Sequence, residues 1–356
     1  MSEPIVQFKD VDIVFGQKPK TALPLIDQGL SRSEIQAKTE QVLGVAGATL
    51  DIHEGEIVVL MGLSGSGKST LLRAVNGLNP VIRGETLVRM EDGSSVNPAT
   101  CPSATLRNLR QKRVAMVFQQ FGLLPWRSVA ENVGFGLEVA GISKPERQKT
   151  VAAQLDLVGL SDWADRRVNE LSGGMQQRVG LARAFATNAP ILLMDEPFSA
   201  LDPLIRDKLQ DDLLELQSEL KRTIIFVSHD LDEALKIGNR IAIMEGGRIV
   251  QTGTAQEIIL NPESDYVAEF VAHMNPLAVM RAGDIYRPDE RPSGGEVVRL
   301  GEAPLTSGTF GLVEADTPIR QVMEAQLATG LPVLVEENGT TIGIIDTEDV
   351  VRALTR

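Results

Sequence analysis

The sequence predicts an α/β protein with a largely parallel sheet, followed by a small C-terminal module of mixed helix and strand. The first observation is that short apolar runs, among them EIVVLMG, PILLMDEP and TIIFVSHD, alternate with segments of helical spacing. The second is a change around residues 275–308, where Pro, Gly and charged residues accumulate before a helix, a hairpin and another helix. We therefore expect a main domain over residues 1–275, and a linker with a small module over 276–356.

Composition narrows the class of protein. The chain has 356 residues, 43% of them hydrophobic, enough for two or three globular domains. Its net charge of −13 argues against nucleic-acid binding, which depends largely on neutralising phosphates. The single cysteine, Cys101, excludes an intrachain disulfide and is typical of a reducing compartment. The apolar runs are shorter than the ~20 residues that span a bilayer, and MSEPIVQFKD lacks the features of a signal peptide. We expect any membrane role to depend on another subunit.

The first half of the main domain begins with a strand, because IVQFKDVDIVFG alternates apolar and polar residues. A helical insert is expected over residues 17–43, since LSRSEIQAKTEQVLG has helical spacing after a serine. EIVVLMG predicts a strand ending in glycine, and KSTLLRAVNGL predicts an amphipathic helix after a Gly/Ser loop. VAMVFQQF predicts the next strand, and residues 127–188 are expected to be mostly helical.

The second half continues the alternation. PILLMDEP predicts a short strand ending in acids, residues about 203–220 a helix, and TIIFVSHD another strand. RIAIMEGGRIVQTG predicts a hairpin that turns at EGGR. In the tail, an Asn-Gly turn predicts a hairpin between two helices. This module has a small core, so we expect it to pack on a second copy or on the main domain.

The segment GLSGSGKST matches the phosphate-binding loop (P-loop) pattern G-x-x-x-x-G-K-[ST]. Gly62 and Gly67 let backbone N–H groups curl around phosphates, Lys68 supplies positive charge, and Ser69 offers a hydroxyl to Mg²⁺. The alternative is a chance Gly/Ser loop. The strand before it and the helix after it favour the phosphate site.

Two acids end the apolar run ILLMDEP. Asp195 would hold Mg²⁺ through water, as sites of phosphoryl transfer require. Glu196 would polarise an attacking water as general base, an effect worth roughly 10²–10⁴-fold in rate. The alternative, a solvated pair or a helix cap, is disfavoured by the P-loop in the same chain.

Three further residues follow or end predicted strands. His229 could contact a γ-phosphate or orient Glu196, although a lone histidine is more often structural. Gln119 could ligate Mg²⁺ or the attacking water, and the alternative is an exposed glutamine. Phe15 could stack on a nucleobase, and a core phenylalanine fits the local pattern equally well.

A second glycine pattern lies in LSGGMQQR. Ser172 can cap a helix, and Gly173 and Gly174 leave its first N–H groups accessible to an anion. Arg178 and Arg183 on that helix would keep a phosphate site electropositive. An ordinary capped helix is the alternative.

Together these motifs resemble the ATP-binding cassette (ABC) ATPases. The resemblance covers roughly residues 5–270, with GLSGSGKST, FQQF, LSGGMQQR, LLMDEP, SALD and VSHD in that family's order. It implies a P-loop NTPase cassette with a mainly parallel core sheet, an antiparallel β subdomain and a helical subdomain at about 127–188. It also implies ATP and Mg²⁺ as cofactors and ATP-dependent homodimerisation.

The resemblance also assigns roles. Lys68, Gln119, Glu196 and His229 are implied to be catalytic, and Ser69, Gln119 and Asp195 to hold the metal. Ser172, Gly173, Gly174 and Gln176 are implied to serve the ATP of a partner subunit, with Asp202 in the loop between subunits. Phe15 lies near the position of the family's adenine-stacking aromatic. The remaining implied ATP contacts are those of the P-loop: Gly62, Ser64, Gly65, Ser66, Gly67, Lys68, Ser69 and Thr70.

The detailed pattern is most similar to the ATPases of quaternary-amine importers, for glycine betaine, proline betaine or choline. The features are the helical insert, the run GLLPWRSVAENVGFGLEVAG and a tail resembling a cystathionine-β-synthase (CBS) repeat. One full CBS repeat is expected, with a truncated first repeat at NPLAVMRAGDIYRP, and a dimerising role for the tail. The resemblance implies membrane permease subunits as partners, in contact with about residues 119–141. It implies a periplasmic or lipid-anchored substrate-binding protein indirectly, and a peripheral position on the cytoplasmic side of the plasma membrane.

The sequence is also compatible with three other functions: an importer ATPase for another small solute, a soluble ABC ATPase without a transport role, and a non-catalytic nucleotide sensor. The second usually has two fused cassettes or a long coiled coil, which this chain lacks. The presence of Glu196 and His229 argues against the third.

Overall fold

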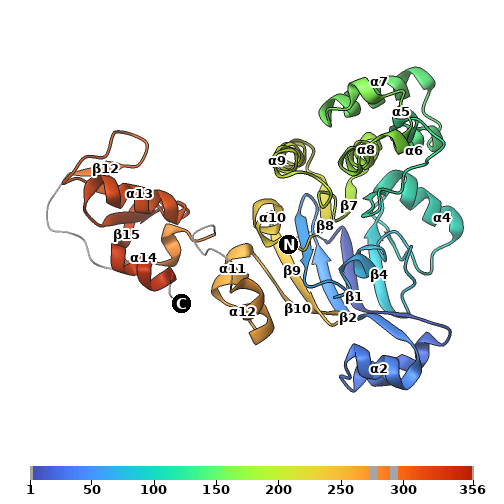
Figure 1. Ribbon diagram of the computed structural model, residues 1–356. Coiled ribbons are helices and arrows are strands. Elements are labelled where there is room, and N and C mark those ends of the chain that lie inside the picture. Colours follow the sequence, from blue (N-terminus) through green and yellow to red (C-terminus); the bar gives the residue numbers. More distant parts are fainter. Residues whose placement is uncertain (1–2, 273–278, 289–295, 355–356) are drawn as a thin grey trace. The chain divides into compact units, whose positions relative to one another are not determined.

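The computed structural model describes residues 3–272, 279–288 and 296–354, which form two compact units, Met1–Thr254 and Ala255–Arg356 (Figure 1). The boundary lies about twenty residues before the expected one at 275. The reason is that α11 (Ala255–Leu260) belongs with the second unit, since Leu260 packs against that unit's core and Gln256 donates a hydrogen bond to Asp284. The expected linker falls partly on residues 273–278 and 289–295, which lie outside the described residues.

The first unit contains a six-stranded sheet in the order β10-β9-β3-β8-β7-β6. The five strands from β9 to β6 are parallel, and β10 pairs antiparallel with β9 as the predicted hairpin. The largely parallel α/β sheet is therefore confirmed. The strands are β3 (Ile57–Met61), β6 (Val114–Val117), β7 (Ile191–Asp195), β8 (Thr223–Val227), β9 (Arg240–Glu245) and β10 (Arg248–Gly253).

An antiparallel sheet of four strands, in the order β2-β1-β4-β5, accompanies it. A single core cluster contains residues of both sheets and of the helix that follows the P-loop, such as Phe8, Leu60 and Leu71. That helix is therefore fixed between the two sheets. The strands are β1 (Val6–Phe15), β2 (Val42–Ile52), β4 (Arg83–Arg89) and β5 (Ser95–Val96).

The helix after the P-loop, α3 (Lys68–Leu72), is shorter than KSTLLRAVNGL predicted. The next hydrogen bonds join residues three apart, from Ala74 N to Leu71 O and from Val75 N to Leu72 O, so the segment continues as turns. Further helical segments of this unit are α4 (Ser103–Asn108), a π-helical turn (Leu109–Arg113), α9 (Pro203–Leu220) and α10 (Leu231–Ile237).

Helices fill most of the range 127–188 and gather at one side of the unit (green in Figure 1). They are α5 (Val129–Val133), α6 (Phe135–Val139), α7 (Lys144–Leu157) and α8 (Gly173–Ala186). The expected insert also exists: β1 and β2 are joined through a 3-10 turn (Pro19–Ala22), α1 (Leu23–Asp27) and α2 (Arg32–Thr39).

The second unit has a five-stranded sheet in the order β11-β15-β14-β13-β12. The predicted hairpin is β14 (Val333–Glu337) with β15 (Thr340–Ile345), and the two predicted helices are α13 (Ile319–Thr329) and α14 (Thr347–Leu354). The other elements are α12 (Asp265–Val271), β11 (Arg287–Pro288), β12 (Val297–Arg299) and β13 (Phe310–Glu314). Across the three described ranges, every helix is too short or too polar to cross a membrane.

Candidate nucleotide site

The P-loop follows β3 and needs its glycines for steric reasons. Gly62 has φ 138°, and a Cβ there would lie 2.1 Å from the carbonyl oxygen of Met244. Gly67 has φ 108° at the start of α3, and its Cβ would lie 2.6 Å from the carbonyl oxygen of Gly44. Both positions combine a left-handed conformation with close backbone contact, so only glycine fits. Ser64 and Gly65 are exposed at the tip of the loop, whereas Ser66 is buried.

Lys68 is buried within this loop. Its Nζ donates to the carbonyl oxygens of Gly62, at 2.7 Å, and Leu63, at 3.0 Å. Burial lowers the pKa of the Lys68 ammonium, while the charges of Glu196 and Asp195 act in the opposite direction. The ammonium is thus enclosed by the loop that is expected to bind phosphate.

Ser69 and Asp195 are brought together by the strand order, because β8 alone separates β3 from β7. The Ser69 hydroxyl donates to Asp195 Oδ1 at 2.6 Å. Arg73 Nη2 donates to Asp195 Oδ2 at 2.7 Å, and Asp195 is fully buried. The buried carboxylate therefore has a partner for each oxygen, as a buried charge requires.

Glu196 lies beside two other predicted catalytic side chains, Gln119 and His229. Its Oε2 accepts a hydrogen bond from Gln119 Nε2 at 3.2 Å and lies 3.4 Å from His229 Nδ1. Glu196 and His229 line a small cavity of about 40 Å³ with Ser199 and Ser228, large enough for a water molecule. The residues that the sequence indicated therefore converge at the carboxyl ends of β6, β7 and β8.

Phe15 is half-exposed at the end of β1 and lies beside the P-loop helix. A Cβ on Gly44 would lie 2.9 Å from both the Phe15 ring and the Thr70 methyl group. The insert separates Phe15 from the P-loop in sequence, but Phe15 and Val42 are paired in the β1–β2 ladder. The two ends of the insert therefore meet, and Phe15 stays next to Thr70.

The second glycine pattern starts α8. Ser172 caps the helix, its Oγ accepting from Met175 N at 3.3 Å, and Gln176 Nε2 donates to Leu171 O at 3.1 Å. Outside the helix itself, a Cβ added at Gly173 or Gly174 would meet atoms of residues 121, 200 and 201. None of these neighbours belongs to the P-loop of the same chain.

Arg178 and Arg183 donate hydrogen bonds to backbone carbonyl groups, and a contribution of their charge to the start of α8 stays a prediction. Arg178 Nη1 donates to Val158 O at 3.0 Å. Arg183 donates to Gly122 O at 2.7 Å and to Phe121 O at 2.9 Å. Both arginines lie toward the body of α8, where burial lowers their pKa, and serve as backbone anchors.

Gln177 is a residue that the sequence analysis missed. Its buried Nε2 donates to Glu196 O at 3.0 Å, and its Oε1 accepts from Ala200 N at 2.9 Å. It therefore joins α8 to the segment after β7. Its spacing relative to the buried Gly180 and Ala184 is a signal that a polar residue stands on the apolar face of this helix.

Asp202 is the N-cap of α9. Its Oδ1 accepts a hydrogen bond from Ile205 N at 3.1 Å, so the side chain caps that helix.

The fold and the site define a P-loop nucleotide-binding protein with a parallel core sheet, an antiparallel sheet and a helical segment. Comparisons with known proteins narrow this class. The family model described as ABC transporter matches residues 45–199, and the model described as CBS domain matches residues 312–356.

Two relatives are similar over most of their length. The glycine betaine/proline betaine transport system ATP-binding protein ProV of Escherichia coli (strain K12) is 51% identical, over 79% of this chain and 69% of the relative. The glycine betaine/carnitine transport ATP-binding protein GbuA of Listeria monocytogenes serotype 1/2a (strain 10403S) is 41% identical, over 98% and 97%. A dimeric ATP-binding cassette in a post-hydrolysis state, bound to ADP and Pi, superposes with a TM-score of 0.60 at 31% identity, over 70% of this chain and 98% of that one. The chain belongs to the ATP-binding proteins of ABC transporters, a family of ATPases.

Proposed function

We propose that this chain hydrolyses ATP to drive uptake of a quaternary amine through a membrane permease. The observation that carries the proposal is the convergence of Lys68, Asp195, Glu196 and His229 on one edge of the parallel sheet. The solute class rests on the names of ProV and GbuA, which describe transport of glycine betaine, proline betaine and carnitine. A peripheral position on the cytoplasmic face of the membrane follows from this role.

Hydrolysis would use the side chains as the geometry arranges them. The P-loop N–H groups and Lys68 bind the β- and γ-phosphates, and the aromatic face of Phe15 holds the adenine. Glu196 takes a proton from the attacking water, and His229 and Gln119, both beside its Oε2, orient that carboxylate and the water. Each of these roles is a proposal.

Mg²⁺ fits the residues present. Ser69 and Asp195 place a hydroxyl and a carboxylate oxygen 2.6 Å apart beside the P-loop, and such oxygens, completed by water and phosphate, are the ligands that Mg²⁺ prefers. Gln119 is the third residue proposed to reach it. The ion would neutralise charge on the transferred phosphate.

ATP would be enclosed between two copies of the chain. A Cβ on Gly173 or Gly174 would meet residues outside their own P-loop, and we propose that these two glycines, with Ser172 and Gln176, contact the ATP of a partner. The dimeric solved cassette, with bound ADP and Pi, supports this arrangement. We propose that Asp202 lies in the loop between subunits, and that the CBS module adds contacts between the two copies.

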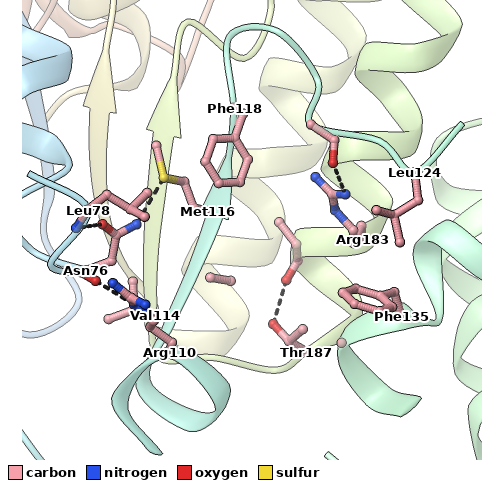
Figure 2. A pocket seen from close by; sticks show the side chains of 14 residues that line it. Asn76, Leu78, Arg110, Val114, Met116, Phe118, Leu124, Phe135, Arg183 and Thr187 are labelled. Atoms are coloured by element: carbon pink, nitrogen blue, oxygen red, sulfur yellow. Dashed lines mark hydrogen bonds between the residues drawn. The ribbon is translucent and has the colours of Figure 1, made fainter. Parts of the chain in front are cut away.

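A groove between the core sheet and the helical segment is the proposed docking site for the permease (Figure 2). It has a volume of about 360 Å³ and is mostly apolar, and Arg110 and Arg183 are among the residues that line it. An amphipathic loop or helix from a membrane subunit has the shape and polarity to fill it. The apolar lining residues include Leu78, Met116, Phe118, Leu124 and Phe135. A substrate-binding protein would then deliver the solute to that permease.

The test is reconstitution of the chain with its permease and binding protein in vesicles. We expect ATP-dependent uptake of radiolabelled glycine betaine or choline, with unlabelled quaternary amines as competitors. Uptake of an unrelated solute, uninhibited by quaternary amines, would overturn the solute class while leaving the ATPase role intact.

Lys68→Ala is expected to lower ATP hydrolysis and uptake at least 100-fold, because removing a buried charge beside the transferred phosphate costs about 3 kcal/mol or more. Lys112→Ala, at an exposed lysine, is the matched control and should retain full turnover. Phosphate release by the purified protein measures both. Unchanged turnover of Lys68→Ala would refute the site assignment.

A further inference from the structure

The insert between β1 and β2 has a core of its own. It leaves the sheet after Phe15 and returns at Val42, which are paired with each other. Apolar side chains of the insert pack with those of the two strands rather than facing solvent. The buried members of this cluster are Val14, Ala22, Ile26, Ile35, Leu43 and Ala46.

Polar contacts fix the insert on the sheets. Gln41 Oε1 accepts from Lys18 N at 2.9 Å and closes its base. Arg83 on β4 donates to both oxygens of Asp27, at 2.7 and 3.0 Å. A capping box of Ser31 and Glu34 then fixes the first turn of α2. The position of that turn is therefore well defined.

The first residue of α2 reaches the P-loop. Arg32 Nη2 donates to the carbonyl oxygen of Gly44 at 2.8 Å, and Nη1 donates to the carbonyl oxygen of Gly65 in the loop itself. Ser66, the next residue of the P-loop, is bonded to the turn after β9, because Gly247 N donates to Ser66 O at 3.0 Å. The carbonyl groups on the outer side of the P-loop are thus bonded from two directions.

In the part of the chain that the structure describes, Arg32 contacts backbone groups rather than acids. Within the described ranges no carboxylate lies in ion-pair contact with it, and its guanidinium bonds only to backbone carbonyls. Burial lowers the pKa of Arg32. A partly buried cation next to the tip of a P-loop favours an anion in that loop.

We propose that Arg32 is a positioning residue for the nucleotide, and that it couples the insert to nucleotide affinity. A loop that turns its N–H groups toward phosphates must turn its carbonyl groups outward, where they need partners. Arg32 supplies one partner from a rigid insert. The inference rests on the proposed ATP binding at this loop.

Arg32→Ala should raise the dissociation constant for a fluorescent ATP analogue, and KM for ATP, about tenfold. The turnover at saturating ATP should stay within about twofold, because Arg32 touches none of the proposed catalytic side chains. The dissociation constant of Arg32→Lys should lie between those of the wild type and Arg32→Ala. An ammonium keeps the charge but lacks the forked guanidinium that reaches both carbonyl groups. Lys38→Ala, an exposed lysine on the same helix, should bind like the wild type and controls for net charge.

Wild-type affinity in both Arg32 variants would overturn the inference. The inference would also be overturned if Arg32→Lys lost melting temperature, turnover and ATP affinity to a similar degree. That pattern would describe a residue whose role is purely structural. Failure of the wild type itself to bind the analogue would instead refute the proposed function.

Discussion

Glu196 has a backbone conformation that few side chains adopt, with φ 49°. Its N–H donates to Val227 O at 3.1 Å, and its carbonyl oxygen accepts from Gln177. These bonds from β8 and α8 hold the residue so that its carboxylate meets Gln119 and His229. The acid itself was predictable from its place after an apolar strand. Its support was not, because the bonds to its backbone come from segments far along the chain.

Glu233 offers a pH-dependent test of the same region. It is buried, accepts from Ser228 and from Gln210 Nε2 at 3.1 Å, and burial raises its pKa although these hydrogen bonds act in the opposite direction. The folded protein therefore binds the proton more tightly than the unfolded chain. This contribution to stability is fully present below the ordinary glutamate pKa of about 4.3 and is lost as pH rises through the folded value.

Glu233→Gln should accordingly gain stability relative to the wild type as pH rises from about 4 to 8, since the amide carries no charge to bury. Urea unfolding at a series of pH values measures the difference in the free energy of unfolding. A difference independent of pH would contradict the prediction. Asp232→Asn serves as the control, because Asp232 lies next to Glu233 on α10 but is exposed.

At the scale of elements, the strands and most helices were predictable because each has a local periodicity. The serine before α2 is an N-cap, and the hairpin β14–β15 turns at Asn338 and Gly339 as the sequence indicated. The pairing of Phe15 with Val42 and the bonds of Arg183 depend on contacts between distant segments. Those contacts have no local pattern, so the sequence alone did not predict them.

Arg183→Ala tests one such long-range link. Arg183 on α8 lines the groove in Figure 2 and binds the carbonyls of Phe121 and Gly122, which both have positive φ. Its removal should leave two carbonyls short of a partner and lower the free energy of unfolding by about 1–3 kcal/mol. Uptake in vesicles should fall more than ATP hydrolysis, because the groove is the proposed permease site.

The matched control is Arg107→Ala, at an exposed arginine on α4. Urea unfolding and the ratio of solute transported to ATP hydrolysed are the measurements. An Arg183→Ala protein with wild-type stability and an unchanged ratio would show that Arg183 neither stabilises the fold nor couples ATP hydrolysis to uptake.

At the scale of the whole molecule, one chain carries two glycine-containing segments that we propose to be two parts of a nucleotide site. The P-loop side includes Lys68, Asp195 and Glu196, whereas the start of α8 at Ser172 has its neighbours elsewhere. In a head-to-tail pair of chains, each copy would supply the P-loop of one site and the α8 start of the other. Two copies would therefore complete two sites, and the dimer would depend on ATP.

Glu196→Gln should trap that dimer. The amide keeps the size of the side chain but removes the proposed base, so ATP stays bound and the contacts between copies persist. Light scattering after size exclusion should give twice the monomer mass with ATP and Mg²⁺, and the monomer mass with ADP. Adding Lys68→Ala should restore the monomer, because the phosphates then lose their buried cation. If Glu196→Gln remained monomeric at saturating ATP and Mg²⁺, the two sites would not be shared between copies of the isolated chain.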